Sequence, residues 1–203
     1  MRHLFTTLFV IGSLAAGCGD SATSTSDGGS GGSTSTSSGA AGSGGTVPSI
    51  DVVLNEIQAQ GEDYVELTNT GSATFDLSGY GVADSLAAGG PKLDAAARFP
   101  ADTTLAAGAH LLLVLEQDPA AGVGPHNVCL ATGGPASCYY TTWGISAASG
   151  EKAYLLAPDD AVVGVVDYPV NAAPVGSSWG RLPDGTGEFQ VTAPTPGEVN
   201  AAP

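Results

Sequence analysis

The sequence from residue 50 onwards predicts an all-β domain, either a sandwich or a barrel. No long stretch after residue 50 repeats its apolar residues with the 3.6-residue period of a helix. The best helix candidate, Lys92 to Arg98, is short and ends just before Pro100. Short apolar or alternating runs recur instead, separated by turn residues, and about seven or eight such runs are typical of a two-sheet domain or a barrel.

The expected strands follow one another along the chain. Residues 50–57 form the first run, and in the second, 63–68, Val65 and Leu67 face one side while Tyr64 and Glu66 face the other. The third run covers 75–83, and Leu111 to Leu115 is apolar on both faces, which predicts a central strand. The remaining runs are 153–157, 162–168, 179–182 and 188–191, with turns at 158–160 and 183–185.

The first 49 residues have the composition of a leader and a tether. Residues 1–17 begin with Arg2 and His3 and continue with an apolar run from Leu4 to Ala16, which is too short to span a bilayer and fits a signal peptide. Residues 18–49 consist almost wholly of Gly, Ser, Thr and Ala, which predicts a disordered tether. The folded domain is therefore expected from residue 50 to residue 203.

The end of the leader, Leu14 to Cys18, resembles a bacterial lipobox, in which signal peptidase II cuts before a cysteine that then carries lipid. Ala16 and Gly17 fit the pattern, although Leu14 lies one place earlier than usual. The resemblance implies that Cys18 is lipidated and anchors the protein to a membrane of the cell envelope. Gly19 favours the outer membrane, on its periplasmic or cell-surface face. The alternative is an ordinary secretory signal followed by an unrelated cysteine.

The charge balance is strongly acidic, with a formal net charge of −15 and only five Lys and Arg residues. Because phosphate binding depends on clustered cations, this balance argues against nucleic acid as a partner. It also disfavours anionic lipid headgroups. The acidic surface either keeps the protein soluble or attracts cations and basic partners.

Several motifs resemble a lamin-tail domain, in the right order over about residues 50 to 201. The opening is carried by Val53–Ile57, Tyr64–Asn69 and Asp76–Tyr80, and the stretch before a hydrophobic strand by Phe99–Gly108. The close is carried by Ser178–Gly185, with its "PDG" turn, and by Thr195–Asn200. Residues 118–149 depart from this pattern and are interpreted as an insertion. The resemblance implies an immunoglobulin-like β-sandwich that serves binding or scaffolding, and it transfers no catalytic residue.

The insertion carries the candidate binding surface. Cys129 and Cys138 are expected to form a disulfide because export supplies an oxidising compartment. Two free buried thiols or a metal pair are the alternatives, although two cysteines with no nearby histidine make a poor zinc site. Tyr139 and Tyr140, beside Cys138, together with Trp143 are expected to form an exposed aromatic platform, whereas Trp179 could equally be buried.

Other side chains are candidates for chemical sites. Residues 176–180 read Gly-Ser-Ser-Trp-Gly, the pattern of a nucleophile elbow, but no histidine follows Ser178, which favours a turn and a strand. Glu56 and Glu66 lie on adjacent predicted strands and could face each other as an acid/base pair, or as an exposed polar pair or backbone acceptors. His110 and His126 form no close metal-ligand pair and are expected on the surface or in loops.

No cofactor is expected, apart from a weak indication of calcium. Asp159, Asp160 and Asp184 lie in predicted turns and could contribute to such a site, but neither EF-hand spacing nor a repeat supports it.

Together these features predict a lipid-anchored, non-catalytic envelope protein whose domain binds or scaffolds a protein or glycan of the envelope or the extracellular space. The alternatives are a hydrolase with an unrecognised carboxylate or serine site, and a purely structural envelope component.

The expected disulfide gives a first testable prediction. Mass spectrometry of a non-reduced digest should find one cross-link between Cys129 and Cys138, which are nine positions apart. A loop this short stabilises the fold by roughly 2–3 kcal/mol in the chain-entropy model. Finding both thiols free in protein taken from the envelope would contradict the pairing.

Overall fold

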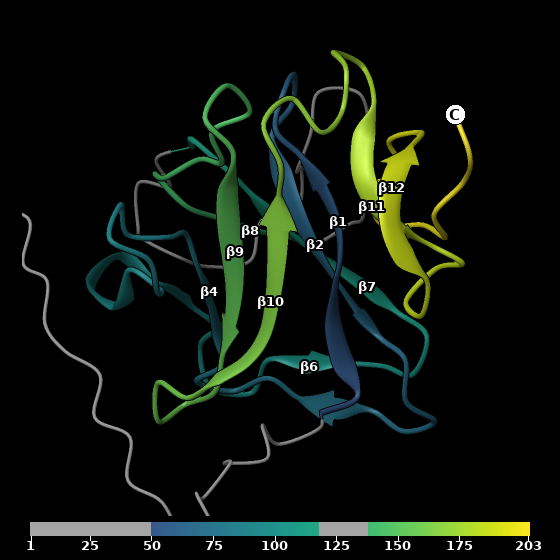
Figure 1. The fold of residues 1–203 in the computed structure, drawn as a ribbon. Helices are drawn as coiled ribbons and strands as arrows, with labels where there is room; N and C mark the ends of the chain where they lie inside the picture. Colours follow the sequence, from purple (N-terminus) through teal and green to yellow (C-terminus); the bar gives the residue numbers. More distant parts are fainter. Residues whose placement is uncertain (1–49, 118–137) are drawn as a thin grey trace, which may run out of the picture. The chain divides into compact units, whose positions relative to one another are not determined.

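The computed structural model describes residues 50–117 and 138–203, which belong to one compact unit. These residues form a two-layer β-sandwich, so the predicted fold class is confirmed (Figure 1). The leader and tether, Cys18, His126 and Cys129 lie outside the described residues. Within the described ranges, no helix is long and apolar enough to cross a membrane.

The larger layer is a six-stranded sheet with the order β12-β11-β1-β2-β7-β8. Its neighbouring strands are antiparallel, except that β8 runs parallel to β7. The strands are β1 (Val52–Gln58), β2 (Tyr64–Asn69), β7 (His110–Val114), β8 (Cys138–Tyr140), β11 (Ser178–Leu182) and β12 (Glu188–Thr192).

The smaller layer is a four-stranded antiparallel sheet with the order β10-β9-β4-β5, and a separate two-stranded pair joins β3 to β6. The strands of the smaller layer are β4 (Gly81–Ala83), β5 (Ala97–Arg98), β9 (Glu151–Leu156) and β10 (Val162–Tyr168). The separate pair consists of β3 (Phe75–Asp76) and β6 (Thr104–Leu105).

The main core lies between the two sheets. Val65 and Leu67 of β2 point into it, as the alternation predicted, and meet Leu155 and Val166 of the opposite sheet within one buried cluster. Tyr64 points to the other face of the six-stranded sheet, where it belongs to a second buried cluster. Because β2 is buried on both faces, something must also cover the outer face of this sheet.

Several predicted elements differ from the structure. The helix candidate at 92–98 is a 3-10 turn, Leu93–Ala95, followed by β5, because a strand partner is available in β4. The run at 75–83 is divided between β3 and β4, which belong to different sheets. The apolar strand β7, by contrast, is confirmed as a central strand, because it is buried along most of its length and pairs with β2 on one side and β8 on the other.

The expected insertion, residues 118–149, stays a prediction, and only residues 138–149 of it are described. Its second half supplies β8 and contributes Tyr139, Trp143 and Ile145 to the main core. These residues are therefore part of the sandwich itself.

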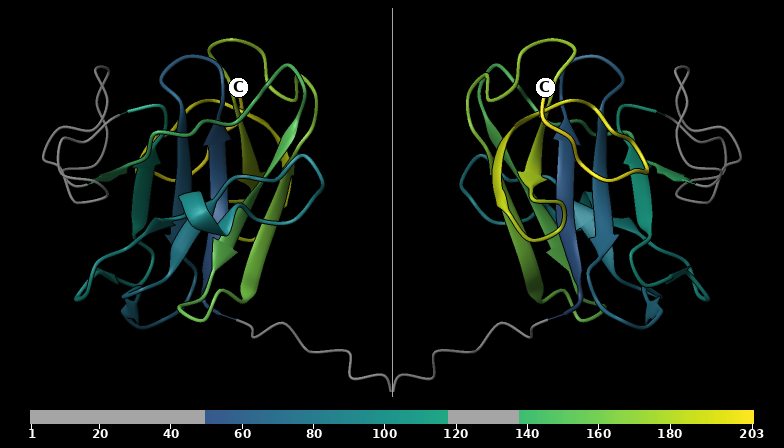
Figure 2. Two further views of the ribbon diagram at one scale, coloured as in Figure 1. Left: turned by 90° about the vertical axis from the view of Figure 1, so that its left-hand side faces the viewer. Right: turned by 90° about the vertical axis from the view of Figure 1, so that its right-hand side faces the viewer.

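The C-terminal strap, residues 193–201, covers the outer face of the six-stranded sheet. It leaves β12 at Ala193, crosses over β1 and β2, and closes on itself through a bridge between Ala193 and Ala201 (Figure 2). Under the strap, the sheet presents polar side chains in place of apolar ones, and these form the candidate site.

Candidate functional site

The site begins with an irregularity in β1. Leu54 pairs with Leu67 and Glu56 pairs with Glu66, so Asn55 is an extra residue in this strand, as in a β-bulge. The bulge brings Asn55 and Glu56 together opposite Glu66, and all three side chains are completely buried. Buried polar groups are costly unless they are hydrogen-bonded, so each of these side chains needs partners.

Glu56 finds its partners on β11 and on the strap. The Ser178 hydroxyl donates a hydrogen bond to Glu56 Oε1. The backbone N–H of Thr195 lies 3.2 Å from the same oxygen, and the Thr195 hydroxyl lies 3.3 Å from Oε2. Burial raises the pKa of the Glu56 carboxyl, and the hydrogen bonds from Ser178, Tyr64 and Thr195 oppose that rise.

The Glu66 carboxyl accepts hydrogen bonds from β1 and from the strap. Asn55 Nδ2 donates to its Oε1 at 2.9 Å, and the Gly197 N–H of the strap donates to its Oε2 at 2.7 Å. Burial raises the pKa of Glu66 to about 9, because these two hydrogen bonds offset the loss of hydration only in part. The nearby charges of Glu56 and Asp184 raise the pKa further.

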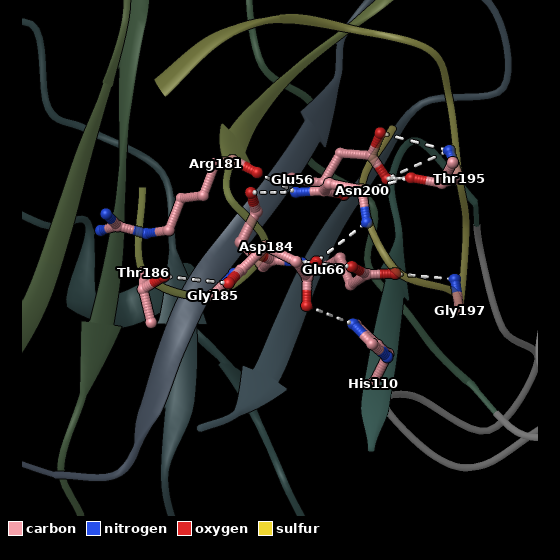
Figure 3. A network of polar contacts seen from close by, with 11 residues as sticks. Glu56, Glu66, His110, Arg181, Asp184, Gly185, Thr186, Thr195, Gly197 and Asn200 are labelled. Carbon is pink, nitrogen blue, oxygen red and sulfur yellow. Dashed lines mark hydrogen bonds and ion pairs between the residues drawn. The ribbon is translucent and has the colours of Figure 1, made fainter. Parts of the chain in front are cut away.

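The turn between β11 and β12 is held by the bulge residue Asn55. Asn55 Nδ2 donates to Asp184 Oδ1 at 2.9 Å, and the Gly185 N–H donates to Asn55 Oδ1 at 2.9 Å. Gly185 has φ +65°, a left-handed conformation that favours glycine. Asp184 also accepts the Asn200 N–H at 2.9 Å, and His110 Nε2 lies 3.4 Å from its second oxygen (Figure 3).

Asn200 fastens the far end of the strap. Its Nδ2 donates to the backbone oxygens of Asn55, at 3.2 Å, and Arg181, at 3.0 Å. This approach requires a glycine at 180, because a Cβ there would lie 2.8 Å from Thr192 Oγ1 and 3.0 Å from Asn200 Nδ2. The network therefore connects β1, β2, the β11–β12 turn and the strap into one hydrogen-bonded unit.

The network corrects the interpretation of several residues. Glu56 and Glu66 do face each other, but they are buried and not an exposed polar pair. Ser178 begins a strand, is completely buried and donates to Glu56, so the nucleophile-elbow pattern corresponds to sheet structure. His110 begins β7 with a side chain only 6% exposed, which differs from the expected surface position.

The expected aromatic platform is not exposed. Tyr139 is 7% and Trp143 8% exposed, and both belong to the main core. Pairing of β8 with β7 directs Tyr139 between the sheets, where its ring packs edge-on against Phe99 and its hydroxyl lies 3.1 Å from Thr103 Oγ1. Tyr140 is half-buried on the opposite face, against the second cluster.

The three candidate calcium ligands, Asp159, Asp160 and Asp184, occupy two different turns. Asp160 pairs with Arg98, Asp159 accepts the Ala161 N–H at 3.2 Å, and Asp184 belongs to the network. Among residues 50–117 and 138–203, no group of three or more His, Cys, Asp or Glu side chains could hold a metal ion. Cys138 is buried on β8, and because Cys129 lies outside the described residues, the disulfide stays a prediction.

The central place of Asn55 can be tested by Asn55→Ala. The substitution removes one buried hydrogen bond each from Glu66, Asp184 and the Gly185 N–H, so the free energy of unfolding should fall by about 3 kcal/mol. Gln190→Ala is the control, because it removes an exposed amide from the adjacent β12 and should change stability by less than about 0.5 kcal/mol. Urea denaturation measures both. Equal effects of the two substitutions would contradict the role given to the network.

The raised pKa of Glu66 makes stability depend on pH. In the unfolded chain the carboxyl ionises near 4.5, whereas in the folded protein it keeps its proton up to about pH 9. The folded state therefore binds more protons between these values, and its contribution to stability, complete below pH 4.5, is lost as the pH rises towards 9.

Glu66→Gln, which is neutral at every pH, should flatten this decline in urea titrations between pH 5 and pH 9. Glu198→Gln, on the exposed side of the same strap, should keep the slope of the wild type. A Glu66→Gln variant with the wild-type slope would show that another group governs the dependence.

The sequence indicated the network residues only as separate motif positions. The visible signal was polar Asn55, Glu56 and Glu66 within otherwise apolar strands, together with the "PDG" and "TPG..N" segments.

The model of one family, the Lamin Tail Domain, matches residues 46–169. No curated protein matches the chain. The family is a non-enzymatic, immunoglobulin-like domain. The matched residues are more than half of the 203-residue chain, and the chain therefore belongs to the lamin tail domain family.

Proposed function

We propose that this protein is a lipid-anchored component of the cell envelope whose lamin tail domain serves as a non-catalytic module for binding or scaffolding. The family supplies the coarser part of this conclusion, since a lamin tail domain is a binding or structural immunoglobulin-like domain. The anchor, the envelope location and the use of the domain for binding a partner are the added steps.

The observation that carries the non-catalytic role is the closure of the polar network. Glu56, Glu66 and Ser178 are the groups that a carboxylate or serine hydrolase would use, and all three are completely buried. Their hydrogen bonds run to one another and to the strap, so a substrate could reach them only if the strap were displaced. Such closed networks are typical of structural hydrogen bonding, because general acid/base work needs contact with a substrate proton.

The anchor is supported by the lipobox-like residues that end in Cys18 and by the composition of residues 18–49. A chain of this Gly/Ser/Thr-rich type spans about 30 Å as a random coil and about 100 Å when stretched. It would hold the sandwich away from the membrane without fixing its orientation. Binding in that setting suits partners that approach from different directions.

The anchor is tested by Cys18→Ser, which should move the protein from the membrane fraction to the soluble fraction after cell lysis. A lipoprotein anchor carries several acyl chains, and each buried methylene contributes about 0.8 kcal/mol to membrane binding, so the shift should be almost complete. Cys129→Ser is the matched control and should remain in the membrane fraction. Unchanged membrane association of Cys18→Ser would refute the anchor.

The non-catalytic role is tested separately by screening the purified protein against ester, phosphate and glycoside substrates. No turnover above background is expected. Turnover that Glu56→Gln abolishes would establish the hydrolase alternative and overturn the proposal.

A further inference from the structure

The two sheets of the sandwich have unequal widths. The smaller sheet ends at β10, which packs over β1, while β11 and β12 continue the larger sheet beyond this point (Figure 1). Within the described ranges, no strand pairs with the other edge of β10. A strand edge of this kind offers unpaired main-chain donors and acceptors to an extended segment.

The direction of these main-chain groups follows from a single contact. The Asp167 carbonyl oxygen accepts a hydrogen bond from Trp179 Nε1 at 3.1 Å and so points away from β9. In an antiparallel ladder the orientation alternates, so the N–H and C=O groups of Val165, two residues earlier, also point to the open edge. The Trp179 side chain occupies the Asp167 carbonyl oxygen at one end of this edge. At the other end, the bulge between Val162 and Gly164 interrupts the regular strand.

The space beside this edge has an apolar floor. Trp179 and Phe189, on β11 and β12, stack with ring centroids 6.4 Å apart, and both are only half-buried although they pack against the main core. The Arg181 guanidinium lies 4.6 Å from the Phe189 ring centroid and donates hydrogen bonds to backbone oxygens of Leu54 and Gly187. A strand added to β10 would lie over Trp179 and Phe189 and would complete their burial.

The opposite side of such a strand would lie beside two aspartates. Val165 is 52% exposed on the outer side of β10, between Asp159 in the preceding turn and Asp167 near its end. Lys152 Nζ lies 2.6 Å from Asp167 and Arg98 pairs with Asp160, so the charges of these two aspartates are offset locally. The chain as a whole carries a net charge of −15, which repels a second copy and attracts basic residues.

We propose that the open edge of β10 binds an extended segment of a partner protein in which apolar and basic residues alternate. The apolar side chains would cover Trp179 and Phe189, and the basic side chains would lie on the outer side near Asp159 and Asp167, where the net charge of −15 attracts them. The proposal rests on the proposed function, because it names the surface and the kind of partner through which the domain would bind.

The probe is a seven-residue peptide of alternating valine and lysine, blocked at both ends and titrated calorimetrically into the purified full chain. Val165→Lys places a cation on the edge and should weaken binding at least about ten-fold. Val175→Lys makes the same change at a loop position that is 79% exposed and should bind as the wild type does. On binding, hydrogen exchange should slow at the Val165 amide.

Absence of peptide binding to the wild-type chain would overturn the proposal, and so would any of three further results. The first is equal binding by Val165→Lys and Val175→Lys, and the second is equal binding of a peptide methylated on every backbone nitrogen, which keeps the charge but cannot pair with a strand. The third is a dimer of the wild-type chain that Val165→Lys abolishes, because a second copy would then occupy the edge. Any of these would leave the proposed envelope role intact, since that role fails on the membrane fractionation of Cys18→Ser or on turnover lost in Glu56→Gln.

Discussion

Two carboxyl groups buried on the outer face of a β-sheet must be supplied with hydrogen-bond donors, and much of this sandwich depends on that constraint. Glu56 and Glu66 lie opposite each other on β1 and β2, where neither can reach water. Some of these donors, the N–H groups of Thr195 and Gly197, belong to the strap, which lies about 130 residues later in the chain. An unsatisfied buried carboxyl would cost more than a typical hydrogen bond contributes, so the strap and the sheet stabilise each other.

The same constraint explains why widely separated motifs belong together. The bulge at Asn55 offers an amide whose N–H groups donate to Glu66 and Asp184 and whose oxygen accepts from Gly185. Asp184 in turn accepts the backbone N–H of Asn200 at the end of the strap. The family match ends at residue 169, yet β11, β12 and the strap complete the sheet that the matched part begins. Ser178, which matches a catalytic motif in the sequence, belongs to this hydrogen-bond network.

The sandwich consequently has one closed surface and one open one. On the outer face of the six-stranded sheet the strap donates hydrogen bonds to Glu56 and Glu66, and both carboxyl groups are closed off from solvent. Beside β10, by contrast, the smaller sheet stops while the larger one continues, and half-buried aromatic rings remain next to a strand edge. A domain with buried carboxyl groups and an unpaired strand edge suits recognition better than chemistry, because binding needs exposed pairing groups and catalysis needs accessible reactive ones.

The sequence by itself determined the class of the fold, most of the strands and the alternation of β2, because apolar periodicity and turn residues are local signals. It also pointed to the family, because short motifs of the lamin-tail pattern follow one another in the right order along the chain. Only the tertiary structure decided what those motifs do: that Glu56 and Glu66 are buried under the strap, that β8 draws Tyr139 into the core, and that β10 is left at an edge. The physical reason is that burial and hydrogen-bond partners depend on contacts between residues far apart in the chain, such as Asn55 with Gly185, about which a local pattern carries no information.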